Sequence, residues 1–213
     1  MGSDIAININ MQQSPRDYLL SPVDFKIYQD WTPVINFAET LIAKSKEMHS
    51  DIRPRGNVNF YDLGLVGSVG HHHISKHWYI VSGAWMRKHL PWLNKMITDL
   101  AEIEPDPTIT FARSDVAEHI DIAAGPTALN YPIFTADAET WVRDVDGQEY
   151  TYPSNADQPW LLHTHKPHGI RVRSPYRVAF GMHFGKEYPE VRAWFDAHPN
   201  LVYGTKLNYT NAQ

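Results

Sequence analysis

Most of this chain consists of short runs of β-branched and aromatic residues that are separated by glycine, proline, asparagine or aspartate. Runs of this length, bounded by turn-forming residues, predict β-strands. We expect strands around residues 57–62, 77–81, 108–112, 117–122, 127–134, 149–152, 168–172, 176–184 and 201–209. So many short strands favour a sandwich or barrel, because each strand must bury one face against a second layer.

Three stretches have the periodicity of helices instead. Thr32 is a candidate N-cap with Pro33 at the first helical position, and apolar residues then recur at helical spacing to about residue 48. A second helical stretch runs from about 90 to 103, and a short third one follows Pro189. The sequence therefore predicts a mainly β fold with flanking helices.

The composition fits one globular domain over residues 1–213, whose N-terminal part would supply the backing helices. The formal net charge is −5 and no run of Lys or Arg occurs, so we expect no nucleic-acid partner. No stretch is apolar enough to cross a membrane, and the absence of cysteine fits a reducing, cytoplasmic location. Any metal must then be held by nitrogen and oxygen ligands. No feature indicates an oligomeric state.

His119 and Asp121 are separated by one residue within a predicted strand. Side chains at positions i and i+2 of a strand point to the same face, so both could turn toward one ion. Two imidazoles and one carboxylate can occupy one face of an octahedral Fe(II) and leave the opposite positions open. His168 is a candidate for the third ligand, with His163 and His165 as rivals.

The strand predicted at 176–184 has two different faces. Its apolar face consists of Val178, Phe180, Met182 and Phe184, and its small and polar face consists of Arg177, Ala179, Gly181 and His183. We expect the apolar face to pack under the helices, and the other face to leave room for a ligand. An inward Arg177 implies an anionic partner, either a ligand or an acidic residue, because burying an unpaired charge is costly. His183 would reach a substrate or satisfy a hydrogen bond in the core.

A resemblance to a known family is carried by two segments, AEHIDIAAGPTALNYPIF and PHGIRVRSPYRVAFGMHF. Together they resemble the Fe(II)- and 2-oxoglutarate-dependent oxygenases, in the branch that contains the prolyl and aspartyl/asparaginyl hydroxylase-like proteins. The resemblance covers residues 117–184 and rests on the order His-x-Asp, then His, then Arg nine positions later. It implies a double-stranded β-helix, a jelly-roll or cupin-like core of two facing antiparallel sheets with the metal between them.

The same resemblance implies roles for particular residues. His119, Asp121 and His168 would bind Fe(II). Arg177 would hold the distal carboxylate of 2-oxoglutarate, and Asn130 would line the pocket of this cosubstrate. The implied activity is that of a dioxygenase, which uses O2 to hydroxylate an unactivated C–H bond of a peptidyl side chain or small molecule and releases succinate and CO2.

Two alternatives stand beside this interpretation. The first is a non-catalytic, cupin-like β-sandwich binding protein in which Arg177 sits in an internal salt bridge. The second is a different metal-dependent cupin enzyme that needs no keto acid. Loops at 64–76 and 144–160 are expected to surround the mouth of the site. Within the first of them, the His71-His72-His73 cluster is interpreted as a solvated loop, with a substrate contact as the alternative.

Overall fold

The computed structural model of the chain describes residues 15–36, 39, 65–66, 78–81, 83–112, 115–122, 124–134, 137–154 and 158–205. The strand expected at 57–62 and the histidine cluster at 71–73 lie outside the described residues, as do the far ends of the first helix and of the last strand. The expectation of one domain over residues 1–213 stays a prediction. No helix of the described residues is long and apolar enough to cross a membrane.

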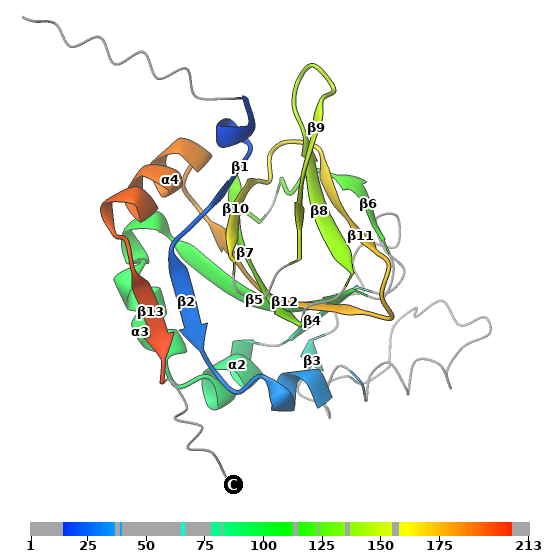
Figure 1. The fold of residues 1–213 in the computed structure, drawn as a ribbon. Coiled ribbons are helices and arrows are strands. Elements are labelled where there is room, and N and C mark those ends of the chain that lie inside the picture. Colours follow the sequence, from blue (N-terminus) through cyan, green and yellow to red (C-terminus); the bar gives the residue numbers. More distant parts are fainter. Residues whose placement is uncertain are drawn as a thin grey trace, which may run out of the picture.

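Two antiparallel sheets form the core (Figure 1). The larger sheet has the strand order β1 (Leu20–Pro22), β10 (Trp160–His163), β7 (Thr127–Phe134), β12 (Arg177–Phe184), β5 (Pro105–Ala112), β4 (Trp78–Val81) and β3 (Leu65–Val66). The smaller sheet has the order β6 (Val116–His119), β11 (His168–Val172), β8 (Ala138–Arg143) and β9 (Glu149–Pro153). A separate parallel pair joins β13 (Leu201–Gly204) to β2 (Phe25–Tyr28).

From β5 to β12 the chain passes back and forth between these two sheets. Strands β5, β7, β10 and β12 are neighbours in the larger sheet, whereas β6, β8, β9 and β11 make up the smaller one. This alternation is the connectivity of a double-stranded β-helix. The predicted fold class, mainly β with flanking helices and a jelly-roll, cupin-like core, is therefore confirmed.

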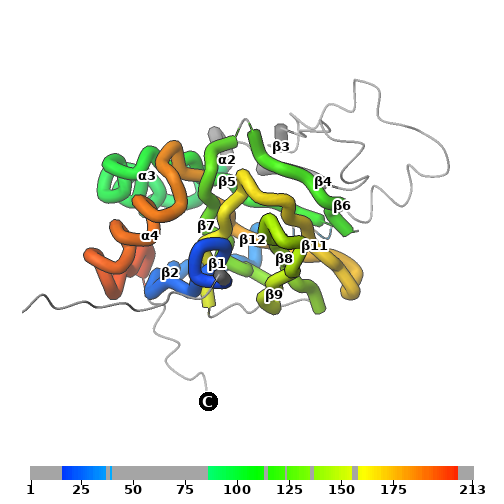
Figure 2. Tube along the Cα trace, turned by 90° about the horizontal axis from the view of Figure 1, so that it is seen from above, coloured from blue at the N-terminus to red at the C-terminus, as the bar shows by residue number. Residues whose placement is uncertain are grey.

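Helices cover the outer face of the larger sheet. They are α2 (Gly83–His89), α3 (Leu93–Asp99) and α4 (Tyr188–Ala197), and Figure 2 shows α3 and α4 on the opposite side from β8, β9 and β11. The apolar face of β12 packs beneath them, as predicted: Phe180 lies 5.7 Å from the ring of Trp92, and Phe184 lies 5.9 Å from that of Phe195. Both phenylalanines are fully buried, and each contributes about 1.5–3 kcal/mol by leaving water.

The helical predictions need three corrections. The stretch expected from 90 to 103 is divided at Leu100 into α3 and a 3-10 turn, η3 (Ala101–Ile103). The turn ends at Glu104, which adopts a left-handed conformation with φ of 54° before β5 begins. In the first helix, Thr32 is already helical and is not the N-cap that was predicted. The Asp30 carboxylate accepts the backbone N–H of Thr32 at 2.9 Å, so Asp30 caps this helix. Helix α2 was not predicted.

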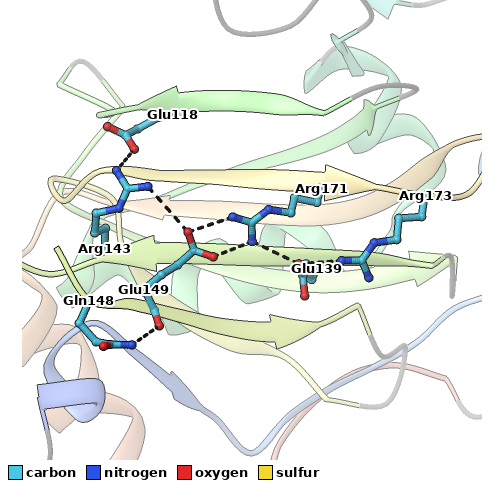
Figure 3. Close-up of polar contacts among 7 residues, drawn as sticks. All are labelled: Glu118, Glu139, Arg143, Gln148, Glu149, Arg171 and Arg173. Carbon is cyan, nitrogen blue, oxygen red and sulfur yellow. Dashed lines mark hydrogen bonds and ion pairs between the residues drawn. The ribbon is translucent and has the colours of Figure 1, made fainter.

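Six alternating charges cover the outer face of the smaller sheet (Figure 3). They are Glu118, Glu139, Arg143, Glu149, Arg171 and Arg173. The guanidinium carbons of Arg143 and Arg171 lie 5.1 Å and 5.3 Å from the ring of Trp141. That ring rests against Gly169, where a Cβ atom would come within 2.7 Å of it. The outward residues of β8, β9 and β11 therefore form one connected layer.

Candidate metal centre

The three predicted metal ligands lie together. Strands β6 and β11 pair so that His119 and His168 are direct Cα partners, and their ring centroids are 4.2 Å apart. One carboxylate oxygen of Asp121, Oδ1, lies 3.5 Å from Nε2 of His119, and the other, Oδ2, lies 3.4 Å from Nε2 of His168. Ligand atoms about 2.0–2.2 Å from one ion are at most roughly 4.4 Å apart. The observed separations therefore suit one ion.

The backbone fixes the tautomer of both histidines. Nδ1 of His119 lies 2.8 Å from the carbonyl oxygen of Ala117, and Nδ1 of His168 lies 2.8 Å from that of Lys166. A carbonyl oxygen only accepts, so each Nδ1 donates its proton and each Nε2 presents a lone pair. This is the arrangement in which metal-binding histidines are usually held.

The carboxylate of Asp121 is ionised. Burial by itself would raise its pKa, but in the metal-free site the hydrogen bonds that the protonated rings of His168 and His183 donate, together with their charge, outweigh burial and hold the pKa of Asp121 well below its ordinary value. A metal ion takes the place of the proton on Nε2 of His168. Two imidazole lone pairs and a carboxylate thus converge on one point. A cation relieves the repulsion among them, and neutral imidazoles with an ionised carboxylate are the protonation states that bind metals. The donor set therefore fits a divalent metal ion such as Fe(II).

The loop that carries Asp121 is anchored to the turn after β10. The backbone N–H of Asp121 donates to the carbonyl of Thr164 at 3.1 Å, and the Thr164 hydroxyl donates to the carbonyl of Gly125 at 2.7 Å. Gly125 has a φ of 103°, and a Cβ there would collide with the backbone of Phe184. Only glycine fits this position without strain. Asp121 is thereby held at a defined point beyond the end of β6.

Arg177, the first residue of β12, is 2% exposed. Its Nε donates to the hydroxyl of Ser154 at 3.3 Å, and its Nη2 donates to Oδ1 of Asn130 at 2.7 Å. Burial lowers the pKa of Arg177, although the group stays charged near neutrality. Among the described residues, no carboxylate lies within the 4.0 Å of an ion pair with it. Both partners are neutral, so the charge lacks a counter-ion in this part of the chain.

Asn130 connects Arg177 to the smaller sheet. Its Nδ2 donates to the hydroxyl of Tyr152 at 2.7 Å and to that of Thr140 at 3.3 Å. Tyr152 is fully buried, and its ring stacks on Trp160 at 5.0 Å. Asn130 thus lies beside the guanidinium and orients that group, and its role in a cosubstrate pocket stays a prediction.

The guanidinium of Arg177 lies on the face of β12 that also carries His183. Asn130 and Gly181 are direct Cα partners where β7 pairs with β12, so the hydrogen bond to Asn130 places the guanidinium near the level of Gly181. His183 lies two residues further along the same face, on the order of 7 Å away. Its Nε2 is 3.2 Å from Oδ2 of Asp121. Arg177 and the residue that contacts Asp121 therefore share the inward face of β12.

No family model and no curated protein matches the chain. Among solved structures, its neighbours include prolyl hydroxylases and an alpha-ketoglutarate-dependent epimerase, and also a cupin superfamily protein and an oxalate decarboxylase of Bacillus subtilis. A prolyl-4-hydroxylase of Pseudomonas putida is 10% identical at a TM-score of 0.45, over 78% of this chain and 92% of that one. A prolyl hydroxylase of Trichoplax adhaerens, in complex with a peptide fragment of the oxygen degradation domain of hypoxia inducible factor, is 10% identical at a TM-score of 0.45, over 83% and 87%.

A third neighbour, the non-haem alpha-ketoglutarate-dependent epimerase of nogalamycin biosynthesis, is 13% identical at a TM-score of 0.41, over 78% of each chain. Likenesses at these identities and TM-scores carry no information about activity.

The rival ligands lie apart from the triad. His163 stacks on Tyr188 with ring centroids 5.6 Å apart, and neither His163 nor His165 belongs to the group formed by His119, Asp121 and His168. No sequence pattern indicated that Ser154, Tyr152 or Thr140 belongs to the site, because only the pairing of the sheets brings them to Arg177. A pattern did indicate His183, since it shares the inward face of β12 with that arginine.

Proposed function

We propose that this protein is an Fe(II)- and 2-oxoglutarate-dependent dioxygenase. The proposal rests on one observation: a histidine–carboxylate–histidine cluster contacts His183 of β12, and the same face of β12 carries a buried arginine, Arg177, that has no carboxylate partner among the described residues. The cluster alone would suit several metal-dependent cupin enzymes. A buried cation on the strand that contacts it adds a site for a second carboxylate, which is what a 2-oxo diacid presents.

His119, Asp121 and His168 would hold the ion through two nitrogens and one oxygen. When bound, Fe(II) in such a facial triad supplies open coordination positions at which a keto acid and O2 react. In the overall reaction, 2-oxoglutarate, O2 and a C–H bond give succinate, CO2 and a C–OH group. One oxygen atom of O2 enters succinate and the other enters the product.

Arg177 would bind the distal carboxylate of the cosubstrate. Of its five N–H donors, Ser154 and Asn130 accept two in the described part of the chain. The remaining donors on Nη1 and Nη2 can bind a carboxylate in the paired geometry that guanidinium favours. Asn130 is in turn held by the hydroxyls of Tyr152 and Thr140, so the cation is oriented before the ligand arrives. Fixed orientation of the reacting groups lowers the barrier.

For the primary substrate we propose a peptidyl side chain or a small molecule whose C–H bond is presented to the open side of the metal. The proposal follows from the resemblance of residues 117–184 to hydroxylases that act on such side chains. Fluorescence-detected or mass-spectrometric screening of peptides and amino acids for a gain of one oxygen atom tests it.

Calorimetric titration of the Mn(II)-loaded protein with N-oxalylglycine, an inert keto-acid analogue, tests the cosubstrate site. We expect Arg177→Ala to stay folded and to weaken binding by roughly 10–100-fold, because a charged hydrogen-bonded pair contributes about 1.5–3 kcal/mol. Arg173→Ala is the matched control, since Arg173 lies on the outer face with its side chain 57% exposed. Iron-dependent formation of succinate from 2-oxoglutarate then tests the reaction.

The alternatives give different results. A metal-dependent cupin enzyme of another kind would bind the ion and ignore N-oxalylglycine. A non-catalytic binding protein would neither load metal nor form succinate, and Arg177→Ala would unfold it. His168→Ala should abolish metal binding, whereas His165→Ala, at an exposed neighbouring position, should leave it unchanged.

A further inference from the structure

Three histidines surround Asp121, but they fall into two classes. In His119 and His168, Nδ1 donates to a backbone carbonyl, so Nε2 carries the lone pair that a metal would bind. His183 has no such carbonyl at its Nδ1 among the described residues, and its Nε2 lies 3.2 Å from Oδ2 of Asp121. Because a carboxylate only accepts, Nε2 of His183 must carry the proton and donate.

We propose that His183 is a positioning residue that holds Asp121 so that this carboxylate binds the metal through Oδ1 alone. The inference rests on the proposed function. Oδ2 already accepts the hydrogen bond from His183, which engages one of its lone pairs and makes it the poorer ligand. Oδ1 lies 3.5 Å from Nε2 of His119, whereas the hydrogen bond from His183 goes to Oδ2, which also lies 3.4 Å from Nε2 of His168.

His183 is not itself a member of the ligand set. Among the described residues, the atoms that could hold one ion come from His119, Asp121 and His168. His183 reaches the site from the other sheet, as the last inward residue of β12, whereas His168 belongs to β11. Its hydrogen bond therefore fastens the loop that carries Asp121 to the larger sheet.

Coordination of the metal through a single carboxylate oxygen of Asp121 matters for the proposed chemistry. In an octahedral ion, two imidazoles and one carboxylate oxygen leave three positions, enough for a chelating keto acid and O2. A carboxylate bound through both oxygens would occupy one of these three. His183 would thus keep the third position available without touching the substrate.

The test uses Co(II), whose visible absorption reports both occupancy and coordination. Wild type is compared with His183→Ala, with His183→Gln, which keeps an N–H donor of similar reach, and with His165→Ala as the control. We expect His183→Ala to weaken Co(II) binding by about 10–100-fold, as is usual when a hydrogen bond to a metal ligand is lost. Its Co(II) spectrum should also differ from that of the wild type. His183→Gln should restore most of the affinity and the wild-type spectrum.

Circular dichroism and thermal unfolding of each apo protein separate this effect from misfolding. The inference is overturned if His183→Ala binds Co(II) with the wild-type affinity and spectrum, or if folded His183→Gln behaves like the alanine variant. Neither result would contradict the proposed metal site itself. If the wild-type protein itself fails to bind Co(II), the proposed function is overturned together with it.

Discussion

Replacing Asn130 by Asp would place a carboxylate where Arg177 now has only neutral partners. The substitution replaces the NH2 group of the side-chain amide by an oxygen atom and keeps the shape of the side chain. Oδ1 stays 2.7 Å from Nη2 of Arg177, and the hydroxyls of Tyr152 and Thr140 can rotate to donate to the other oxygen. The variant should therefore carry the internal salt bridge that the wild type lacks among its described residues.

The loss of affinity follows from the charges. A ligand carboxylate on the free side of the guanidinium would lie about 6 Å from the new carboxylate, and at an effective dielectric of about 20 the repulsion is about 3 kcal/mol. Each 1.4 kcal/mol is tenfold in affinity, so N-oxalylglycine should bind roughly 100-fold more weakly. The free energy of unfolding should change by only about 1 kcal/mol, because the stronger hydrogen bonds offset the cost of burying the charge.

Calorimetry with the Mn(II)-loaded variant measures the affinity, and urea unfolding measures stability. Tyr152→Phe is the control: it removes the hydroxyl that holds Asn130 without adding charge, and should weaken binding by less than tenfold. If Asn130→Asp binds N-oxalylglycine as tightly as the wild type, Arg177 is not the anion site and the cosubstrate assignment is wrong.

Three further predictions concern the frame around the site. Gly169→Ala would place its Cβ 2.6 Å from the carbonyl oxygen of Val116 and 2.7 Å from the Trp141 ring. The substitution should lower the free energy of unfolding, measured by thermal unfolding, by about 1–3 kcal/mol. It should also weaken Co(II) binding, because β11 must move away from β6. Arg173→Ala should change the free energy of unfolding by less than about 1 kcal/mol, since its ion pairs are exposed. Burial, opposed by the hydrogen bond to Ser21, raises the pKa of Tyr188 from 10.0 to about 12. The unfolded chain loses this proton near pH 10 and the folded chain holds it to about pH 12. About 2–3 kcal/mol of stability, fully present below pH 10, should therefore disappear as the pH rises to 12, and urea unfolding of Tyr188→Phe should lack this loss.

The candidate metal ligands could be picked out because their signal is nearly local, but the reason given for Asp121 was wrong. Strand β6 ends at His119, so the backbone hydrogen bond to Thr164, and not the alternation of a strand, places Asp121. Arg177 was indicated by its place at the start of a strand whose other face is apolar. The contact of His183 with Asp121 had no such signal. It depends on where the end of β12 meets the loop after β6, which is a property of the closed fold.

Strands β1, β2, β3, β8 and β10 were not predicted, and the two that lie between β5 and β12 were missed for different physical reasons. Strand β10 has only four residues, and a run that short is not distinguished from a loop by periodicity. Strand β8 alternates properly, but its outward positions include Glu139 and Arg143, which depress its β propensity. Arg171 pairs with Glu139, and Glu149 pairs with Arg143, in each case from a neighbouring strand. The partners that stabilise β8 as a strand therefore lie outside its own sequence.

The same cross-strand charges bear on the metal centre through the alternation of β11. His168 and Ile170 point inward, whereas Gly169 and Arg171 point outward against Trp141 and the acids of β8 and β9. A slip of one residue would exchange the two faces and turn His168 away from Asp121. Each exposed ion pair adds little stability on its own. A strand that slipped by one residue would lose all of these pairs at once, and the Trp141 ring would meet a side chain instead of Gly169. The ion-pair layer on one face therefore selects the register that assembles the ligands on the other.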